Sequence, residues 1–507
     1  MSWIMKSLVH KGLLIPPRYV GHGLHIRIEE MLWELTPDQE EMAVAWAKKL
    51  ETEYVKDHVF VKNFFKDFSA KLGFAKPLDP KKVDLSEVLQ FVERERERKA
   101  AMSREAKKRA VEDRKALREA NKQRYGYAVV DGIEVEIGNY IAEPSSIFMG
   151  RGKHPQRGRW KEGPNEREIE LNLSPDAPVP ADRWGAVLWQ PDSMWIARWK
   201  DKLSGKMKYV WLSDSAIMKQ RKEIEKFNLA RELDLRLDEV RAHIEESLET
   251  SDETRRRIAT VCYLVDNLMF RVGDEENEAG TVGASTLKPE HVIINKSDGT
   301  TTFDFLGKDS IRFNKTVTLP EAVTLNLEGF KEESSSTIFK GVRSKPVSDF
   351  LGEVMPGLTA KVFRTHHATR SVDSYLRETK LDSSEPDYVK KHVATTANLQ
   401  AAILCNHKRK IPKTWKSSLK KKRERLRELK SRDKKTQKTL EVLEKTNLKI
   451  KEMKATRDYN LGTSLKSYID PRVYYEWGLK VNYDWKNYYP KTLQRKFSWV
   501  EKAEGAE

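Results

Sequence analysis

Two long stretches with almost no Gly or Pro do most to limit how this chain can fold. Residues 84–124 contain neither, and residues 408–457 contain no Gly and a single Pro, Pro412. Glu, Lys, Arg, Leu and Ala dominate both stretches, and these side chains favour helix. Because so many of them are charged, the pattern predicts long solvated helices. In the second stretch it predicts a helical or coiled-coil hairpin that is too polar to be core.

The remaining segments have different periodicities. Short alternating apolar segments across residues 127–212, separated by Gly, Pro and Asp, predict β-strands. Residues 215–407 predict mainly helix, interrupted by a strand hairpin at 301–319. A chain of 507 residues also exceeds what one hydrophobic core usually holds, so we expect roughly three domains.

The net charge indicates the kind of partner. Lys and Arg number 94 against 77 Asp and Glu, which gives a net charge of +17. Such an excess favours a polyanion, either nucleic acid or an anionic membrane, with a charged surface of no special purpose as the alternative. No apolar run approaches the roughly 18 residues that span a bilayer, and the first residues lack the pattern of a secretory signal. We therefore expect a soluble, intracellular protein that binds DNA or RNA and no membrane.

Several kinds of chemistry have no motif in the sequence. Cys262 and Cys405 lie in apolar segments, which predicts buried thiols in a reducing compartment and neither a disulfide nor a zinc site. The chain contains no G-x-x-x-x-G-K-[ST], C-x-x-C, H-E-x-x-H or D-x-D, so an ATP-driven motor and the usual zinc or two-metal sites are not expected. If the protein cuts nucleic acid, it must stabilise the transition state with Arg, Lys and His near a side-chain nucleophile.

Five short phrases in the second half of the chain contain residues that suit this chemistry. They surround Arg271, Lys308, Arg364, His407 and Tyr468. Each residue has an ordinary explanation when taken alone. They could be an ion-paired surface arginine, a hairpin tip, an arginine that caps or crosses a helix, a satisfied histidine and a half-buried aromatic residue. No single phrase therefore identifies a site.

Taken together, the phrases closely resemble the eukaryotic-like type IB DNA topoisomerases. The order Arg, Lys, Arg, His, Tyr is the same, and so are the words FDFLGKDSIR, GLTAKVFRT, AILCNH, LGTS and YxDPR around these residues. The resemblance continues in KNFFKDF at residues 62–68 and in GRGKHPQRG at residues 150–158. Because the matches follow one order over nearly the whole chain, they are very specific to this family.

The resemblance implies a role for each of the five residues. Arg271 and Arg364 would bind the non-bridging oxygens of the scissile phosphate, and His407 would donate a further hydrogen bond to the same phosphate. Tyr468 would attack and form a 3′-phosphotyrosine. Lys308 would protonate the departing 5′-hydroxyl from a flexible hairpin in the minor groove. The reaction would relax positively and negatively supercoiled DNA, and no ATP, metal or other cofactor is expected.

The resemblance also predicts residues that lie close to the DNA. These candidates are Arg151, Lys153, His154, Arg157, Lys208 and Asp309. For the basic run of residues 151–161, a Gly-rich loop with only non-specific phosphate contacts is the alternative. For the hairpin at 415–455, which matches the DNA-facing linker of the family, the alternative is a merely solvated coiled coil.

Fold class and domain boundaries follow from the resemblance as well. The family implies an α+β fold, mostly α, in which a bilobed clamp with a tyrosine recombinase-like catalytic domain encloses duplex DNA. The expected parts are an N-terminal DNA-binding lobe (1–205) with projecting charged helices (84–124), a catalytic core (206–410), a coiled-coil linker (411–457) and a C-terminal domain with the tyrosine (458–507). A clamp can encircle DNA without a second copy, so we expect a monomer. We expect it in the cytoplasm on chromosomal DNA, or in the nucleus if the source is eukaryotic.

Two features depart from the nuclear members of this family. The similarity begins almost at Met1, without a long charged tail before it, which predicts a compact, archaeal-type member. Ser467 precedes the tyrosine where eukaryotic members commonly have Asn, so sensitivity to the plant alkaloid poisons of the family is not implied.

Two other classes of protein are weighed against this interpretation. A tyrosine site-specific recombinase has a related site but usually shows His-x-x-Arg at the second arginine, where this chain has Lys361 and Arg364. A recombinase also lacks the GRGKHP region and the long hairpin between His and Tyr. A binding protein that kept the fold and lost the chemistry is the second alternative, but all five site residues are present.

Overall fold

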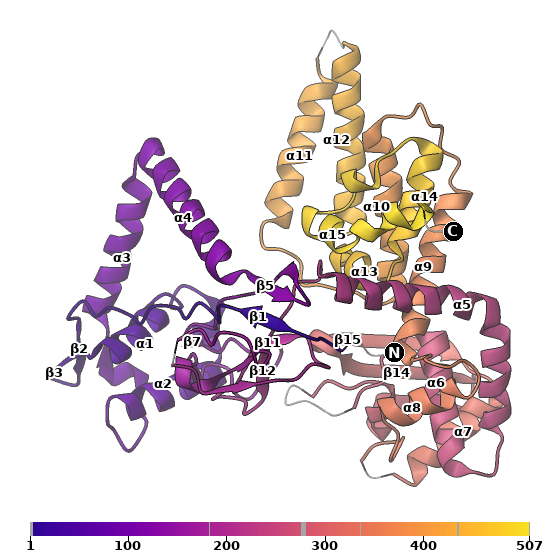
Figure 1. Ribbon diagram of the computed structural model, residues 1–507, viewed down its shortest axis with the longest axis horizontal. Helices are drawn as coiled ribbons and strands as arrows, with labels where there is room; N and C mark the ends of the chain where they lie inside the picture. Colours follow the sequence, from indigo (N-terminus) through magenta and orange to yellow (C-terminus); the bar gives the residue numbers. More distant parts are fainter. Residues whose placement is uncertain (1–3, 182, 275–279, 335, 433–435, 506–507) are drawn as a thin grey trace. The chain divides into compact units, whose positions relative to one another are not determined.

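The structure is a computed structural model that describes residues 4–181, 183–274, 280–334, 336–432 and 436–505. The chain divides into two compact units, Met1–Lys219 and Gln220–Glu507 (Figure 1). Each unit is built around its own hydrophobic cores. Helices and sheets occur in both, so the α+β class predicted from the sequence is confirmed. No helix in the described ranges is both long and apolar enough to cross a lipid bilayer.

Small sheets and α-helices make up the first unit. Its strands are β1 (Leu8–His10), β2 (His25–Ile28), β3 (Met31–Glu34), β4 (Val83–Asp84), β5 (Tyr127–Val130), β6 (Ile133–Glu136), β7 (Ser146–Ile147), β8 (Trp160–Lys161), β9 (Ile169–Asn172), β10 (Ala186–Leu188), β11 (Trp195–Lys200) and β12 (Met207–Trp211). Its helices are α1 (Pro37–Ala47), α2 (His58–Lys71), α3 (Ser86–Ala101) and α4 (Arg104–Tyr125). Strands β5 to β12 lie within residues 127–212, where the alternating pattern predicts them.

The largest sheet of this unit has the strand order β10-β9-β11-β12. β9 and β10 are parallel, and the other neighbours are antiparallel. Ile169 and Leu171 on β9 and Ile196 on β11 are fully buried, so the sheet covers one of the cores of the unit. The alternating apolar residues of this region therefore serve the packing of the sheet.

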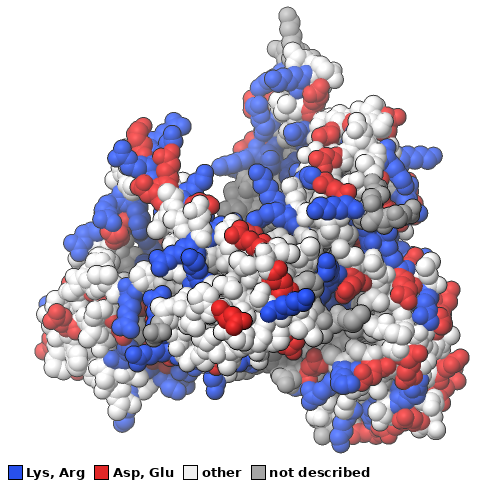
Figure 2. All heavy atoms as spheres, in the orientation of Figure 1, with Lys and Arg blue, Asp and Glu red and all other residues white. Residues whose placement is uncertain are grey.

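The first charged stretch forms two helices, α3 and α4, which meet at a break after Ala101. The side chain of Ser103 accepts a hydrogen bond from the amide of Ala106 and so caps the start of α4. α4 ends at Tyr125, followed by Gly126, directly after the stretch that lacks Gly and Pro. Figure 2 shows Lys and Arg side chains interspersed with acidic ones along this helical pair, in line with a solvated surface.

Helices dominate the second unit. They are α5 (Ile217–Leu248), which begins in the first unit, α6 (Glu253–Leu268), α7 (Glu321–Glu332), α8 (Ser344–Gly352), α9 (Ala360–Glu378), α10 (Asp387–Leu404), α11 (Trp415–Lys430), α12 (Gln437–Ala455), α13 (Leu461–Ser467), α14 (Pro471–Val481) and α15 (Lys491–Lys496). A three-stranded sheet contains β13 (Val292–Asn295), β14 (Thr300–Gly307) and β15 (Ile311–Thr318). β14 and β15 form the hairpin predicted at 301–319.

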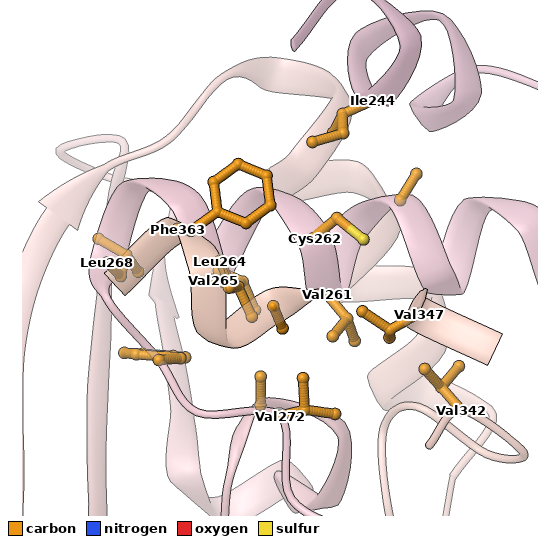
Figure 3. Close-up of a cluster of buried hydrophobic side chains, with 14 of the residues drawn as sticks. Ile244, Val261, Cys262, Leu264, Val265, Leu268, Val272, Val342, Val347 and Phe363 are labelled. Carbon is orange, nitrogen blue, oxygen red and sulfur yellow. The ribbon is translucent and has the colours of Figure 1, made fainter. Parts of the chain in front are cut away.

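A tightly packed core joins α6 to α9. Asp252 caps α6 by accepting hydrogen bonds from the amides of Thr254 and Arg255. In Figure 3, Phe363 of α9 lies in the same buried cluster as Leu264 and other side chains of α6. Cys262 belongs to this cluster, and Cys405 belongs to a second one, so both thiols are buried as predicted.

The second charged stretch contains α11 and α12, which pack against each other as a helical hairpin. Leu429 and Ile450 are buried on this hairpin, while its Lys, Arg and Glu side chains are largely exposed (Figure 2). Thr436 caps the start of α12 by accepting a hydrogen bond from the amide of Thr439. The predicted helical hairpin is thus present between α10 and the last helices of the unit.

Candidate active site

The β14–β15 hairpin holds Lys308 at its tip. Gly307 pairs with Ile311 at the last step of the ladder, and Lys308 is exposed between them. Two steps from the tip of the hairpin, Phe270 packs edge-on against Phe305 of β14 and Phe313 of β15. The hairpin is therefore anchored on Phe270, the residue directly before Arg271.

The segment after α6 holds Arg271. The helix ends where Met269 adopts a left-handed conformation, with φ 59°. The carbonyl oxygen of Arg271 accepts a hydrogen bond of 2.7 Å from the amide of Ala284. A Cβ atom at Gly283 would lie 2.1 Å from the carbonyl oxygen of Val272. Only glycine therefore permits this close approach, which fixes the backbone that presents Arg271.

The second arginine, Arg364, lies on α9 and is only 5% exposed. Its Nη1 donates to the carbonyl oxygen of Met269, and its Nη2 donates to that of Cys405 at 3.0 Å. Its Nε is buried and has no hydrogen-bond partner among the described residues. Backbone oxygens from two separate segments thus orient the guanidinium, and its Nε–H remains without a partner in the described part of the chain.

His407 and Tyr468 complete the group. Tyr468 follows α13 directly and is 4% exposed. The ring centroids of His407 and Tyr468 are 5.2 Å apart. The guanidinium carbons of Arg364 and Arg271 lie 5.1 Å and 5.8 Å from the centre of the tyrosine ring. The structure therefore brings the predicted tyrosine, histidine and both arginines together.

Burial and positive charge shift the protonation equilibria of this group. Burial, then the charges of Arg364 and Arg271, lowers the pKa of His407 to about 3. Burial, then the charge of Arg364, also lowers the pKa of Arg271, although its hydrogen bond with Tyr468 acts in the opposite direction. His407 is therefore neutral at physiological pH, and the site is dominated by two guanidinium charges.

Two neighbouring clefts open at these arginines. Arg271, Lys308 and Arg364 line both of them. His407 lines the first, and Tyr468 lines the second. Among the described residues, no Asp or Glu lines either cleft. Such a surface attracts an anion, and paired guanidinium groups match the geometry of a phosphate.

Ser464 is a residue of this site to which the sequence assigned no role. Its hydroxyl lies 2.7 Å from Nδ1 of His407, and its backbone oxygen accepts from the amide of Tyr468. Thr369 on α9 also contacts the segment, because its hydroxyl donates to the backbone oxygen of Tyr468. The LGTS phrase contained one signal for Ser464, since residues four apart lie on one face of a helix.

The candidate DNA contacts lie mostly in the first unit. Nη1 of Arg157 donates to the carbonyl oxygen of Gly152 in its own loop and lies 2.8 Å from Oδ2 of Asp57, which caps the start of α2. Arg151 and Lys153 of the same loop are exposed. The ring of His154 packs edge-on against Phe148.

The remaining two candidates lie in different units. Lys208 is half-buried on β12, where its backbone pairs with Trp199 of β11. The side chain of Asp309 lies outside the described residues. Within the described ranges, no three His, Cys, Asp or Glu side chains gather in a way that could hold a metal ion.

Comparison with known proteins points to one family for every part of the chain. The DNA binding fragment of eukaryotic DNA topoisomerase I matches residues 1–212, its catalytic core matches residues 215–440, and a C-terminal topoisomerase domain matches residues 440–506.

Individual relatives of the chain are also named as forms of DNA topoisomerase 1. The chain is 33% identical to DNA topoisomerase 1 of Drosophila melanogaster, over 97% of this chain and 54% of the relative. It is 33% identical to DNA topoisomerase 1 beta of Arabidopsis thaliana, over 98% and 58%. It is 32% identical to DNA topoisomerase 1 of Homo sapiens, over 98% and 70%. The chain thus spans a little over half the length of the first two relatives.

Proposed function

The chain belongs to the eukaryotic-like type IB DNA topoisomerase family, and on that premise we propose that it relaxes supercoiled duplex DNA of either sign without ATP. It cuts one strand through a 3′-phosphotyrosine at Tyr468, lets the duplex rotate about the intact strand, and reseals the break. The observation that supports this most strongly is the buried tyrosine ring, which lies against two guanidinium groups and an imidazole. Membership of this family argues against the alternative that the chain is a site-specific recombinase.

In this proposal Arg271 and Arg364 bind the scissile phosphate. Charge accumulates on its non-bridging oxygens when a fifth oxygen approaches phosphorus, and two guanidinium groups stabilise that charge with several N–H donors. Met269 and Cys405 orient Arg364 through their carbonyl oxygens, so little reorganisation is needed when the phosphate arrives. The pair takes the place that metal ions occupy in many other phosphoryl-transfer sites.

His407 acts as a neutral hydrogen-bond donor. In the free protein Arg364 Nη2 lies 3.4 Å from Nε2 of His407, which assigns the ring proton to Nδ1 and a hydrogen bond to Ser464. When a phosphate binds the guanidinium, the ring adopts the other tautomer. Ser464 then donates to Nδ1, and Nε2–H donates to a phosphate oxygen. The serine hydroxyl makes this exchange possible because it can both donate and accept.

In the cleavage step one phosphorus–oxygen bond replaces another. The hydroxyl oxygen of Tyr468 bonds to phosphorus and passes its proton to water in the cleft that it lines, while the bond from phosphorus to the 5′-oxygen breaks. Lys308 gives a proton to that leaving oxygen from the exposed tip of the hairpin. The phosphotyrosine retains the energy of the broken ester, so the reverse reaction reseals the strand without ATP or another cofactor.

We also assign each part of the chain a task on the DNA. Residues 1–205 form one lobe of a clamp, with the loop around Arg151 and Lys153 against the phosphate backbone. Residues 206–410 and 458–507 form the catalytic lobe, and the linker 411–457 lies along the rotating duplex. A single copy suffices to close the clamp, and its substrate is chromosomal DNA.

A plasmid assay tests this function. Positively and negatively supercoiled plasmids are incubated with the protein in EDTA and without ATP. We expect the wild type to relax both, Tyr468→Phe to relax neither, and Tyr459→Phe to match the wild type as a control near the same helix. An inert wild type, or an active Tyr468→Phe variant, would contradict the proposal.

A further inference from the structure

α6 and α9 are connected at two places close to the arginine pair. Arg364 on α9 donates to the carbonyl oxygen of Met269, the residue after the end of α6. Three residues earlier in the chain, Asp266 Oδ1 lies 2.6 Å from Nε2 of His367. His367 in turn lies three residues after Arg364, on a neighbouring turn of α9. The two connections therefore run side by side, about one helical turn apart.

The second connection is built around a buried charge. Asp266 is 1% exposed, and its other oxygen accepts a hydrogen bond of 2.8 Å from Nε of Arg241 on α5. Burial acts to raise the pKa of Asp266, but the hydrogen bonds and charges of His367 and Arg241 outweigh it and hold the pKa below its usual value. The carboxylate is therefore ionised and joins three helices.

The carboxylate and its two partners lie outside the clefts in which the phosphate would bind. Asp266, His367 and Arg241 are absent from the residues that line the two clefts. A buried ion pair is also a poor source of stability, since desolvation offsets much of the attraction between the charges. What such a contact does well is to favour one arrangement of the elements it joins, because a shift of α9 leaves one oxygen of the buried carboxylate without its partner.

We propose that Asp266 and His367 are positioning residues for the arginine pair. Their contact fixes the register of α9 against the end of α6. That register sets the separation between Arg364 on α9 and Arg271, which follows α6. The inference rests on the proposed function, because it concerns how the two guanidinium groups are held for one phosphate.

The inference predicts an effect on the rate of reaction and none on the affinity for DNA. Displacement of a catalytic group by about 1 Å can lower a rate on the order of 100-fold. DNA affinity depends instead on phosphate contacts spread over a large surface. Loss of the Asp266–His367 contact therefore slows cleavage at saturating DNA and leaves binding as it was.

Single-turnover cleavage of a duplex that cannot be religated tests this expectation. His367→Leu removes the contact, and His367→Gln keeps an N–H donor at a similar position. Arg370→Gln is the matched control, because Arg370 joins the same helix to α5 through an exposed contact of 3.3 Å with Asp234. Dissociation constants are measured in a Tyr468→Phe background, and the fraction of molecules that eventually cleave is recorded for each variant.

We expect His367→Leu to lower the cleavage rate constant about 10-fold or more, with a DNA dissociation constant within about twofold of wild type. His367→Gln recovers most of the rate, and Arg370→Gln retains all of it. If His367→Leu does not fold, His367→Ala gives the same comparison.

Three results would overturn the inference. One is an unchanged rate in His367→Leu, and another is a loss that His367→Gln does not recover. The third is a loss that lies wholly in the fraction of active molecules. A wild type that leaves DNA uncut would contradict the proposed function itself, and the two failures are therefore distinguishable.

Discussion

Ser464 contacts both the imidazole of His407 and the backbone of Tyr468. Its hydroxyl lies 2.7 Å from Nδ1 of the histidine, and its backbone oxygen accepts a hydrogen bond of 2.9 Å from the amide of the tyrosine. One buried residue thus holds two members of the site, one through its side chain and the other through its main chain.

Ser464→Ala separates these two contacts, because it removes the hydroxyl and keeps the backbone. A buried polar atom without a partner costs about 1–2 kcal/mol, so we expect single-turnover cleavage to slow roughly 5- to 30-fold. Ser374→Ala, at an exposed position of α9, is the control and keeps the wild-type rate. A change of less than twofold in Ser464→Ala would mean that His407 does not depend on this serine.

The low pKa of His407 predicts how stability depends on pH in the free protein. The unfolded chain protonates this histidine near pH 6.5, whereas the folded protein does so only near pH 3. Between these values the unfolded state binds more protons, so the free energy of unfolding falls as the pH falls.

His407→Gln removes this contribution. Denaturant titrations of both proteins should show that the wild type loses roughly 2–3 kcal/mol more than the variant between pH 7 and pH 4. Comparison of the two proteins cancels the contributions of His10 and His366, whose pKa values are also lowered by burial. Parallel stability curves would show that His407 titrates normally in the folded protein.

Lys308→Ala tests the general acid. Removal of a general acid lowers the rate on the order of 100- to 10,000-fold when the leaving group is an alkoxide. A substrate with sulfur in place of the 5′-bridging oxygen leaves as a thiolate and needs no proton. We expect this substrate to restore the variant to near the wild-type rate.

Lys315→Ala, on β15 of the same hairpin, serves as the control and cleaves both substrates normally. If Lys308→Ala cleaves both substrates equally slowly, the lysine has another role, such as binding the phosphate.

Gly158→Ala tests the packing of the basic loop. This glycine has φ +87°, and a Cβ atom would lie 2.0 Å from the carbonyl oxygen of Phe60 on α2. Gly132 has a similar φ of +80° but open space around it. Gly132→Ala therefore shows only backbone strain of about 1 kcal/mol. Gly158→Ala adds the clash, and we expect a clearly larger drop in melting temperature together with weaker DNA binding. Equal drops would show that the loop yields easily.

Part of this structure could be predicted from local sequence. The hairpin that carries Lys308 and the helices of both charged stretches follow from side-chain periodicity and from the absence of Gly and Pro. The sequence pattern did not predict the break between the two helices after Ala101. Charged residues continue on both sides of it, and Ser103 alone marks the start of the new helix. A helix or strand can thus be predicted from sequence where the residues of its own short segment determine its structure.

The site itself follows from tertiary packing. Arg271 and Tyr468 lie far apart in the chain, and only the resemblance to a family grouped them. Contacts such as those of Ser464 with His407 or of Asp266 with His367 depend on how helices pack against each other. The four-residue spacing of Ser464 and Tyr468 indicates at most a shared helix face, so the contacts of these residues with other helices could be found only in the structure.

The most direct test of the central claim is to identify the covalent bond between protein and DNA. A duplex that traps the cleaved state is labelled on the scissile strand at either the 5′ or the 3′ end, denatured after reaction, and the linked peptide is mapped by mass spectrometry. We predict that only the 5′-labelled strand stays attached and that the linked residue is Tyr468. Attachment of the 3′-labelled strand, or a link to any other residue, would contradict the account.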